Sequence, residues 1–299
     1  MTTQSATGTV SRIQLGRHLR ELREGARISL REAGRRLELS AATVSRMENG
    51  ETSVRSLDVE QACKIYGVSD PEVVRSLMDL ALETKAKSWL QSYADVVSDN
   101  FAMYVGFEAA ASALAWYEPD FVPGLLQTHD YARSVMELER FTGKQPAPDL
   151  MERRLDFRLD RQQILRRESG APELTVVVGE AALRRSIGGA ETMAGQLAHL
   201  LEITHLTNIE LRVMPLDREH GGLTTGQFIV LDFPSRGNGR LIEPPGVYVD
   251  GYLGFHYTVK PDEVELYRTA WSTVWDTAYD AEQSADFISH RLEELQQRT

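Results

Sequence analysis

The most constraining feature of the sequence is a succession of helix-capping signals between residues 25 and 50. Ser29 is followed three residues later by Glu32, the pattern of a capping box, and Ser40 directly precedes a second helical segment. Gly25 and Gly50 stand where a glycine commonly ends a helix. These signals predict one helix that ends at Gly25 and three more, over residues 30–37, 41–49 and 57–66.

The packing of these short helices can be predicted from the residues that share a face. Leu15, Leu19 and Leu22 have the spacing of one helical face. Gly34 supplies the small residue that a close contact between two helices requires, and a turn follows at Glu38 and Leu39. In the helix after this turn, Val44 and Met47 are expected in the core, and the outward-facing residues are Ala41, Ala42, Thr43, Ser45 and Arg46. Such a pair of helices suits DNA, because the second helix fits into the major groove.

The charge of the chain is distributed in a way that favours one nucleic-acid-binding patch. The net charge is −11, but residues 1–70 contain 11 Lys and Arg against 9 Asp and Glu, a net of +2, which leaves −13 for the rest. Residues 12–46 alone contain nine Arg and four Glu. DNA affinity depends on the local charge that faces phosphates, so a basic patch on an acidic body is compatible with DNA binding.

The run from Leu39 to Gly50 resembles the recognition-helix signature of the lambda-repressor-like, XRE-type helix-turn-helix family. The resemblance covers residues 12–68 and implies that Arg46 reads a base, most naturally guanine. The sequence departs from the family at Glu38, where glycine is usual, and at Leu30, where a phosphate-binding glutamine is common and its role can pass to Arg31. The implied DNA-binding residues are Arg31, Ser40, Ala41, Ala42, Thr43, Ser45 and Arg46, with Asn49, Thr52, Ser53 and Arg55 as further phosphate contacts.

Beyond residue 70 the pattern changes from helices alone to helices mixed with strands. We expect a mainly α N-terminal helix-turn-helix bundle and a helical linker, followed by a small α/β C-terminal domain. The chain is predicted to be helical from Pro71 to about Trp116, and four apolar or alternating runs predict strands at 174–178, 209–214, 227–233 and 247–252. The expected divisions are a disordered tail over 1–10, a DNA-binding domain over 11–70, a helical middle region over 71–169 and an α/β domain over 170–299.

A second resemblance rests on the segment Val122–Thr128, together with matching residues before and after it. These residues are similar to a C-terminal domain of unknown function in actinobacterial helix-turn-helix regulators, which is described as antitoxin-like. The resemblance implies a small protein partner encoded nearby. Residues 123–128 could form part of a pocket or a packing hinge, and the sequence leaves both possibilities open. The candidate ligand- or partner-binding residues are Trp116, Tyr117, Glu118, Phe121 and Glu180, and either glutamate could equally cap a helix or pair with an arginine.

The sequence contains no recognisable catalytic or metal-binding motif. It contains no G-x-S-x-G elbow, no Walker loop and no H-E-x-x-H motif. The one cysteine, Cys63, cannot form an internal disulfide, and the spacing of His199 and His205 does not place two ligands on one helix face. We therefore expect no enzymatic activity, no metal and no cofactor. No apolar run approaches the about 20 residues of a membrane helix, and we expect a cytoplasmic protein without a membrane role.

These observations leave one main hypothesis and two alternatives. The main one is a sequence-specific transcriptional regulator that binds a palindromic double-stranded operator as a homodimer, with half-sites about 34 Å apart. Its C-terminal domain would be controlled by a small protein partner or a ligand. The first alternative is an antitoxin-like protein that neutralises a small partner and binds DNA for autoregulation. The second is a regulator whose C-terminal domain senses a small molecule.

Overall fold

The computed structural model of the chain describes residues 6–52, 54–83, 92–93, 95–143, 147–168, 170–234, 243–251 and 254–297. The chain divides into two compact units, Met1–Phe107 and Glu108–Thr299. The α/β unit therefore begins near Glu108, about sixty residues earlier than the predicted boundary at residue 170. The reason is that a strand which the sequence did not predict lies in the middle of its sheet.

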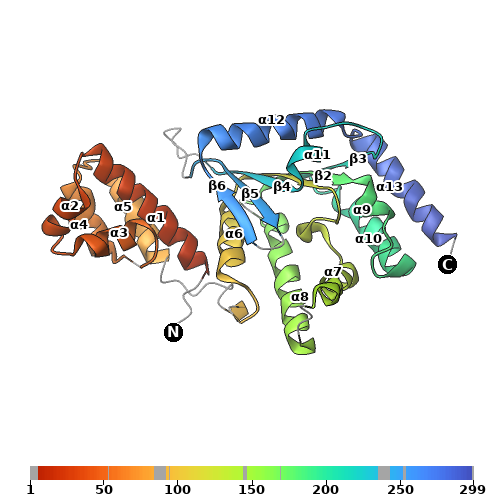
Figure 1. The fold of residues 1–299 in the computed structure, drawn as a ribbon, viewed down its shortest axis with the longest axis horizontal. Coiled ribbons are helices and arrows are strands. Elements are labelled where there is room, and N and C mark those ends of the chain that lie inside the picture. The colour runs from red at the N-terminus through yellow and green to blue at the C-terminus, as the bar shows by residue number, and fades with distance from the viewer. Residues whose placement is uncertain are drawn as a thin grey trace. The chain divides into compact units, whose positions relative to one another are not determined.

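The first unit is built from helices, as predicted (Figure 1). Its five leading helices are α1 (Ala6–Gly25), α2 (Leu30–Arg36), α3 (Ala41–Glu48), α4 (Ser56–Ile65) and α5 (Pro71–Glu83). Helix α6 (Asp99–Ala110) spans the division between the units. The predicted disordered tail is wrong for residues 6–10, which form the first turns of α1, and residues 1–5 lie outside the described part of the chain.

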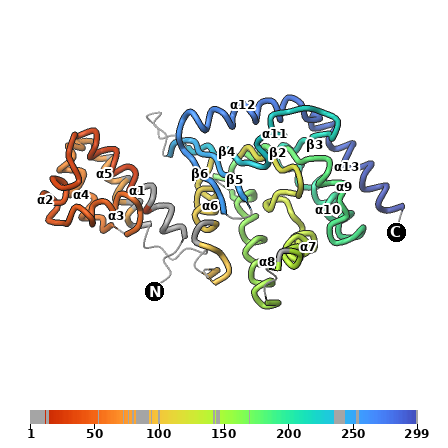
Figure 2. The backbone as a smooth tube through the Cα atoms, in the orientation of Figure 1, coloured from red at the N-terminus to blue at the C-terminus, as the bar shows by residue number. Residues whose placement is uncertain are grey.

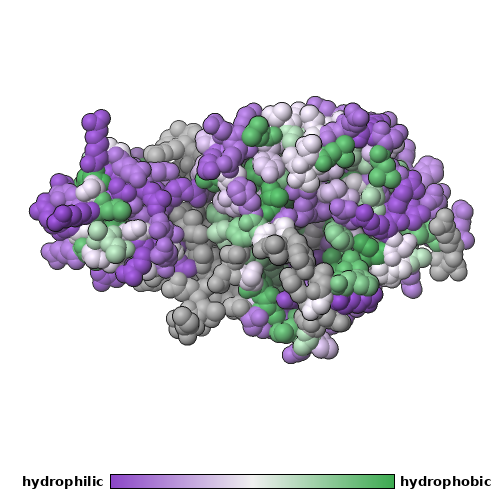
Figure 3. Space-filling view, in the orientation of Figure 1, coloured by the Kyte–Doolittle hydropathy of each residue, from purple (hydrophilic) through white to green (hydrophobic). Residues whose placement is uncertain are grey.

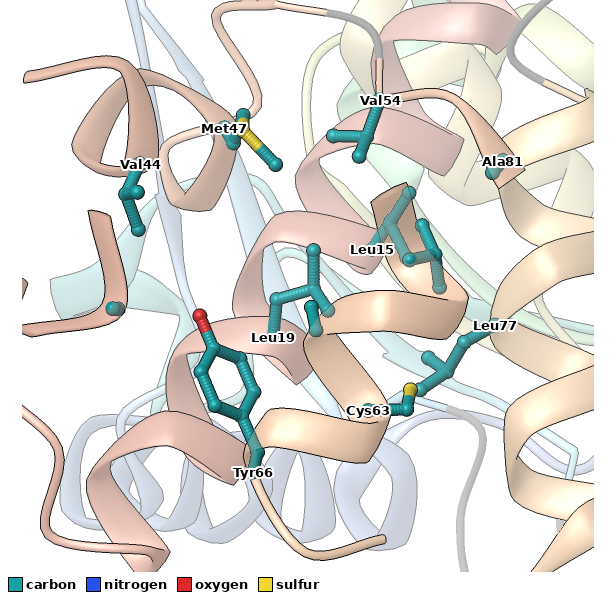
Figure 4. Close-up of a cluster of buried hydrophobic side chains, with 12 residues drawn as sticks. Leu15, Leu19, Val44, Met47, Val54, Cys63, Tyr66, Leu77 and Ala81 are labelled. Atoms are coloured by element: carbon teal, nitrogen blue, oxygen red, sulfur yellow. The ribbon is translucent and has the colours of Figure 1, made fainter. Parts of the chain in front are cut away.

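One hydrophobic core holds the helices of the first unit together. The predicted face of α1 contributes Leu15 and Leu19, which meet Val44 and Met47 from α3, all with 6% or less of their surface exposed. Figure 4 shows these side chains converging with Val54, Tyr66 and Leu77. Because α3 is anchored by two core side chains, its opposite face is left at the surface.

The second unit is organised around a mixed sheet with the strand order β3-β2-β1-β4-β5-β6 in its described part. Strands β1, β2 and β3 are parallel, whereas β4, β5 and β6 continue the sheet in antiparallel pairs. The strands are β1 (Ala113–Glu118), β2 (Glu173–Gly179), β3 (Ile209–Met214), β4 (Phe228–Asp232), β5 (Gly246–Gly251) and β6 (Gly254–Thr258). The predicted helix up to Trp116 is therefore wrong over β1, and β6 was not predicted.

Helices cover both faces of this sheet (Figures 1 and 2). Helix α12 (Pro261–Thr277) lies along one face, where its Val264 and Val274 pack with Tyr117, Val177 and Phe228. Helices α7 (His129–Glu137), α8 (Pro148–Gln162) and α10 (Gly189–Ile203) lie on the other side. The remaining short helices are η2 (Gly124–Leu126), η3 (Leu138–Thr142), η4 (Gln163–Arg166), α9 (Glu180–Arg184) and α11 (Gly222–Thr225), and α13 (Ala281–Gln296) closes the chain.

Candidate nucleic-acid interface

The turn between α2 and α3 has the local chemistry that the sequence predicts. A Cβ on Gly34 would lie only 2.7 Å from the carbonyl oxygen of Leu39, so only glycine allows α2 to approach the turn this closely. Glu38 adopts a left-handed conformation with φ of 56°, which strains any residue other than glycine. The backbone N–H of Thr43 donates to the Ser40 hydroxyl at 3.0 Å, so the N-terminus of α3 is capped.

Helix α3 presents a small, mainly polar face to solvent. Ala41, Ala42 and Arg46 are exposed, and Thr43 and Ser45 are half-buried. The Arg46 guanidinium lies 3.4 Å from the Thr43 hydroxyl, one helical turn earlier. The structure therefore places the predicted base-reading residues together on one face, and the surface of the first unit is largely hydrophilic (Figure 3).

A buried ion pair that the sequence did not reveal fixes α1 against the end of α3. The Arg23 guanidinium donates to both carboxylate oxygens of Glu48, at 2.6 and 2.8 Å, and to the carbonyl oxygen of Ile28 at 2.8 Å. Only 8% of the Arg23 side chain and 2% of the Glu48 side chain are exposed. The hydrogen bonds to Glu48 raise the pKa of Arg23. The pair therefore joins α1 to the end of α3 within the unit.

The predicted phosphate contact Asn49 is held by neighbours on two sides. Its side-chain oxygen accepts a hydrogen bond from Arg20, and its amide nitrogen donates to Glu51 at 3.1 Å. Arg20 also lies 3.6 Å from the Glu48 carboxylate. Arg20 is one of the nine arginines of residues 12–46, and no signal in the sequence connects it with Asn49, which is 29 residues away.

The structure narrows the basic patch that the sequence predicts. Arg12 and Arg23 are buried, so these two arginines do not present their charge at the surface. Arg55 is exposed, but its guanidinium forms two 2.8 Å hydrogen bonds with Asp58, and a phosphate contact must share or replace this carboxylate. Arg31 is exposed. Thr52 is half-buried, and Ser53 lies outside the described residues.

Two of the three aromatic candidates of the second unit, Trp116 and Tyr117, are buried in its core. Trp116 and Tyr117 are neighbours in the central strand β1, so their side chains point to opposite faces of the sheet. Trp116 is 7% exposed and Tyr117 is 3% exposed, whereas Phe121 is half-buried. The Tyr117 ring packs edge-on against His220 and at a tilt against Phe228, which lies under α12.

The two candidate carboxylates are engaged with the backbone near the carboxyl ends of the parallel strands. Burial raises the pKa of Glu118 to about 7, an effect that hydrogen bonds from the backbone N–H groups of Asp120 and Phe121 partly oppose. Glu180 accepts from the N–H of Leu216 at 3.0 Å and pairs with Arg184. Glu180 therefore pairs with an arginine, one of the roles that the sequence left open, whereas Glu118 accepts hydrogen bonds from the backbone of the turn that follows β1.

The segment Val122–Thr128 is a packing element, fastened by buried amide side chains. Gln196, which is fully buried, donates to the carbonyl oxygen of Leu126 at 2.8 Å and accepts from the N–H of Thr128 at 2.7 Å. Gln162 donates to the carbonyl oxygens of Gly124 and Gln127. These bonds fix the segment between α8 and α10, so the matching family residues here hold the fold together.

We also searched the described part of the chain for metal-binding clusters and for membrane-spanning helices. Within it, no three His, Cys, Asp or Glu side chains are grouped so that they could hold a metal ion. No helix in these ranges is long and apolar enough to cross a membrane.

The fold of the first unit defines its class: a tightly joined helix pair whose capped second helix exposes a polar face is a helix-turn-helix domain. In agreement, residues 14–77 match the family model described as "Helix-turn-helix domain". Residues 101–290 match the family model described as "Domain of unknown function (DUF5753)". The second match covers more than half of the chain, and the protein therefore belongs to this family. Comparisons with curated proteins and with solved structures give no significant match.

Proposed function

We propose that the protein is a sequence-specific transcriptional regulator that binds double-stranded DNA through α3. The observation that carries this proposal is the exposed face of Ala41, Ala42 and Arg46 on a helix whose position is fixed by the Arg23–Glu48 ion pair. Arg46 reads guanine through a bidentate contact with its major-groove edge, and the two alanines contact thymine methyl groups. Arg31 and Asn49 position the unit on the phosphates.

A single helix-turn-helix offers a small contact area, so we also propose that the protein acts as a homodimer on a palindromic operator. The second unit regulates DNA binding in response to a small protein partner or a ligand. We propose that the second unit acts without enzymatic activity or a cofactor, because its candidate carboxylates Glu118 and Glu180 are bound to backbone N–H groups and Glu180 also to Arg184. The alternative is an antitoxin-like role. In that case the main function is to neutralise a small protein partner, and DNA binding serves autoregulation.

The test is binding of the full chain to the DNA upstream of its own gene, measured by fluorescence anisotropy at two salt concentrations with a scrambled duplex beside it. Arg46→Ala is expected to lose about 1–3 kcal/mol of specific binding and to relax the preference at one base position. Arg31→Ala should weaken binding to all duplexes about equally, because phosphate contacts carry no sequence information.

The matched control is Arg185→Ala, which removes an exposed arginine from the second unit and should leave binding unchanged. Equal operator affinity for wild type and Arg46→Ala would contradict the assignment of the base-reading residue. Equal, weak binding of the wild type to the upstream and scrambled duplexes would contradict sequence-specific binding at that site. Sedimentation of the complex then shows whether one or two chains occupy the operator.

A further inference from the structure

The second unit contains a cavity of about 180 Å³ between α10, β3 and α13. Its walls are mainly aliphatic, and the lining residues are Leu201, Thr204, Ile209, Glu210, Leu211, Ala281, Ala285 and Ile288. None of the aromatic candidates from the sequence lines it. Its place in the fold is the outer edge of the sheet, because β3 is the terminal strand of the described part.

The cavity exists because α13 is short of side-chain volume where it faces β3. Ala281 and Ala285, one helical turn apart, contribute only methyl groups to the lining. The helix is meanwhile fixed at both ends: near its start Ser284 accepts from the N–H of Val213 at 2.9 Å, and further along Arg291 donates to the carbonyl oxygen of Arg184 at 3.2 Å. Anchored in this way, α13 cannot settle into the gap, although interiors are normally close-packed.

The backbone at the outer edge of β3, where no further described strand pairs with it, also borders the cavity. The N–H of Val213 bonds to Ser284, and its carbonyl oxygen accepts from the N–H of Tyr279, so Val213 directs its backbone groups away from β2. Backbone groups alternate between the two edges along a strand, so Leu211 directs its N–H and carbonyl to the same side. Leu211 lines the cavity, and no strand of the described sheet lies beyond β3.

The polar side chains of the lining already have partners. The Thr204 hydroxyl donates to the carbonyl oxygen of Leu201 at 2.8 Å, and the Glu210 carboxylate pairs with Arg212 at 2.9 Å. A bound molecule would therefore contact an aliphatic surface and one backbone donor–acceptor pair, the N–H and carbonyl oxygen of Leu211.

We propose that this cavity binds a small, mainly apolar molecule that carries a single amide-like group. The volume is sufficient, because an enclosed aliphatic cavity of about 150 Å³ binds benzene in another protein, and here the site is also open to solvent beside the exposed Ala281. The amide fits, because its carbonyl oxygen and N–H complement the N–H and carbonyl oxygen of Leu211. The site lies within the second unit, so the inference does not depend on whether the first unit binds DNA.

Benzamide is the probe, since it joins one benzene ring to one amide. It is titrated into the full chain while the melting temperature and the NMR amide resonance of Leu211 are followed. Ala285→Leu fills the cavity and should weaken binding by about tenfold or more, because pocket binding depends on free volume. The matched control Glu282→Leu adds the same side chain at an exposed position of α13 that does not line the cavity, and should bind like the wild type.

Ala281→Leu is a second variant that fills the cavity, at a lining residue that is exposed. It tests benzamide binding if Ala285→Leu does not fold. Binding to the wild type and Glu282→Leu that the filling variants lose, with a shifted Leu211 resonance, is the expected result. The proposal is overturned if the wild type shows no change in melting temperature or resonance, or if both filling variants bind benzamide as the wild type does. Equal affinity for benzene and benzamide would overturn the assignment of the amide.

Discussion

Replacing Glu118 by glutamine should change how the stability of the second unit depends on pH. Burial raises the pKa of this carboxyl from 4.5 to about 7, and only 6% of the residue is exposed. Below pH 4.5 the group is protonated in both the folded and the unfolded chain, so it costs nothing there. As the pH rises towards 7, the unfolded chain releases the proton first, and the free energy of unfolding falls.

The size of the effect follows from the pKa difference between the two states. One pKa unit is worth about 1.36 kcal/mol, so the shift corresponds to about 3 kcal/mol of stability that is present below pH 4.5 and lost by pH 8. Glutamine keeps a side-chain oxygen for the N–H of Asp120 and cannot ionise. Glu118→Gln should therefore match the wild type near pH 4.5 and exceed its stability by about 3 kcal/mol at pH 8.

Urea unfolding of the full chain at pH 4.5 and pH 8 measures this difference, with tryptophan fluorescence as a reporter because Trp116 lies two residues from the mutated site. Glu173→Gln, at an exposed position of β2, is the matched control and should follow the wild type at both pH values. A wild-type protein that keeps the same stability relative to Glu118→Gln at both pH values would refute the reasoning that burial dominates this carboxyl.

Two predictions concern the stability of the first unit. Glu48→Ala removes the buried partner of Arg23 and leaves only the exposed Glu24 carboxylate at 3.3 Å, so it should cost about 3–5 kcal/mol in urea unfolding, whereas the double variant with Arg23→Met should recover most of the loss; equal losses in the single and double variants would contradict this. Glu38→Gly relieves the left-handed conformation at the turn and should stabilise the unit by about 1 kcal/mol; a melting temperature at or below that of the wild type would argue against strain at this position.

The first unit was predictable because its signals are local. Ser29 and Ser40 accept hydrogen bonds from backbone N–H groups three residues later, so each cap can be recognised within one turn of sequence. Leu15 and Leu19 reach the core through helical periodicity alone. The Arg23–Glu48 pair, by contrast, joins residues 25 positions apart, and Arg23 looks like any other member of the arginine run. A contact of that range has no periodic signature in a single sequence.

The errors in the second unit have the same physical origin. The run Ala113–Glu118 carries no turn signal at its start, and it becomes a strand because β2 and β4 pair with it on both sides. Strand formation of this kind depends on neighbours distant in the sequence. Because the sequence predicts a helix over this strand, the predicted boundary of the α/β unit falls at residue 170 instead of near Glu108.

The location of β1 also explains why two of the aromatic candidates for a ligand site, Trp116 and Tyr117, are buried. Aromatic residues on a central strand enter the two cores on either side of the sheet, as Trp116 and Tyr117 do, and fill the volume that a ligand would need. Space for a ligand remains where a helix with small side chains crosses an edge strand, as Ala281 and Ala285 do beside β3. In a sequence, two alanines at helical spacing look like ordinary helix formers. In this fold, therefore, the aromatic residues of β1 mark the core, and the small side chains of α13 beside β3 mark the pocket.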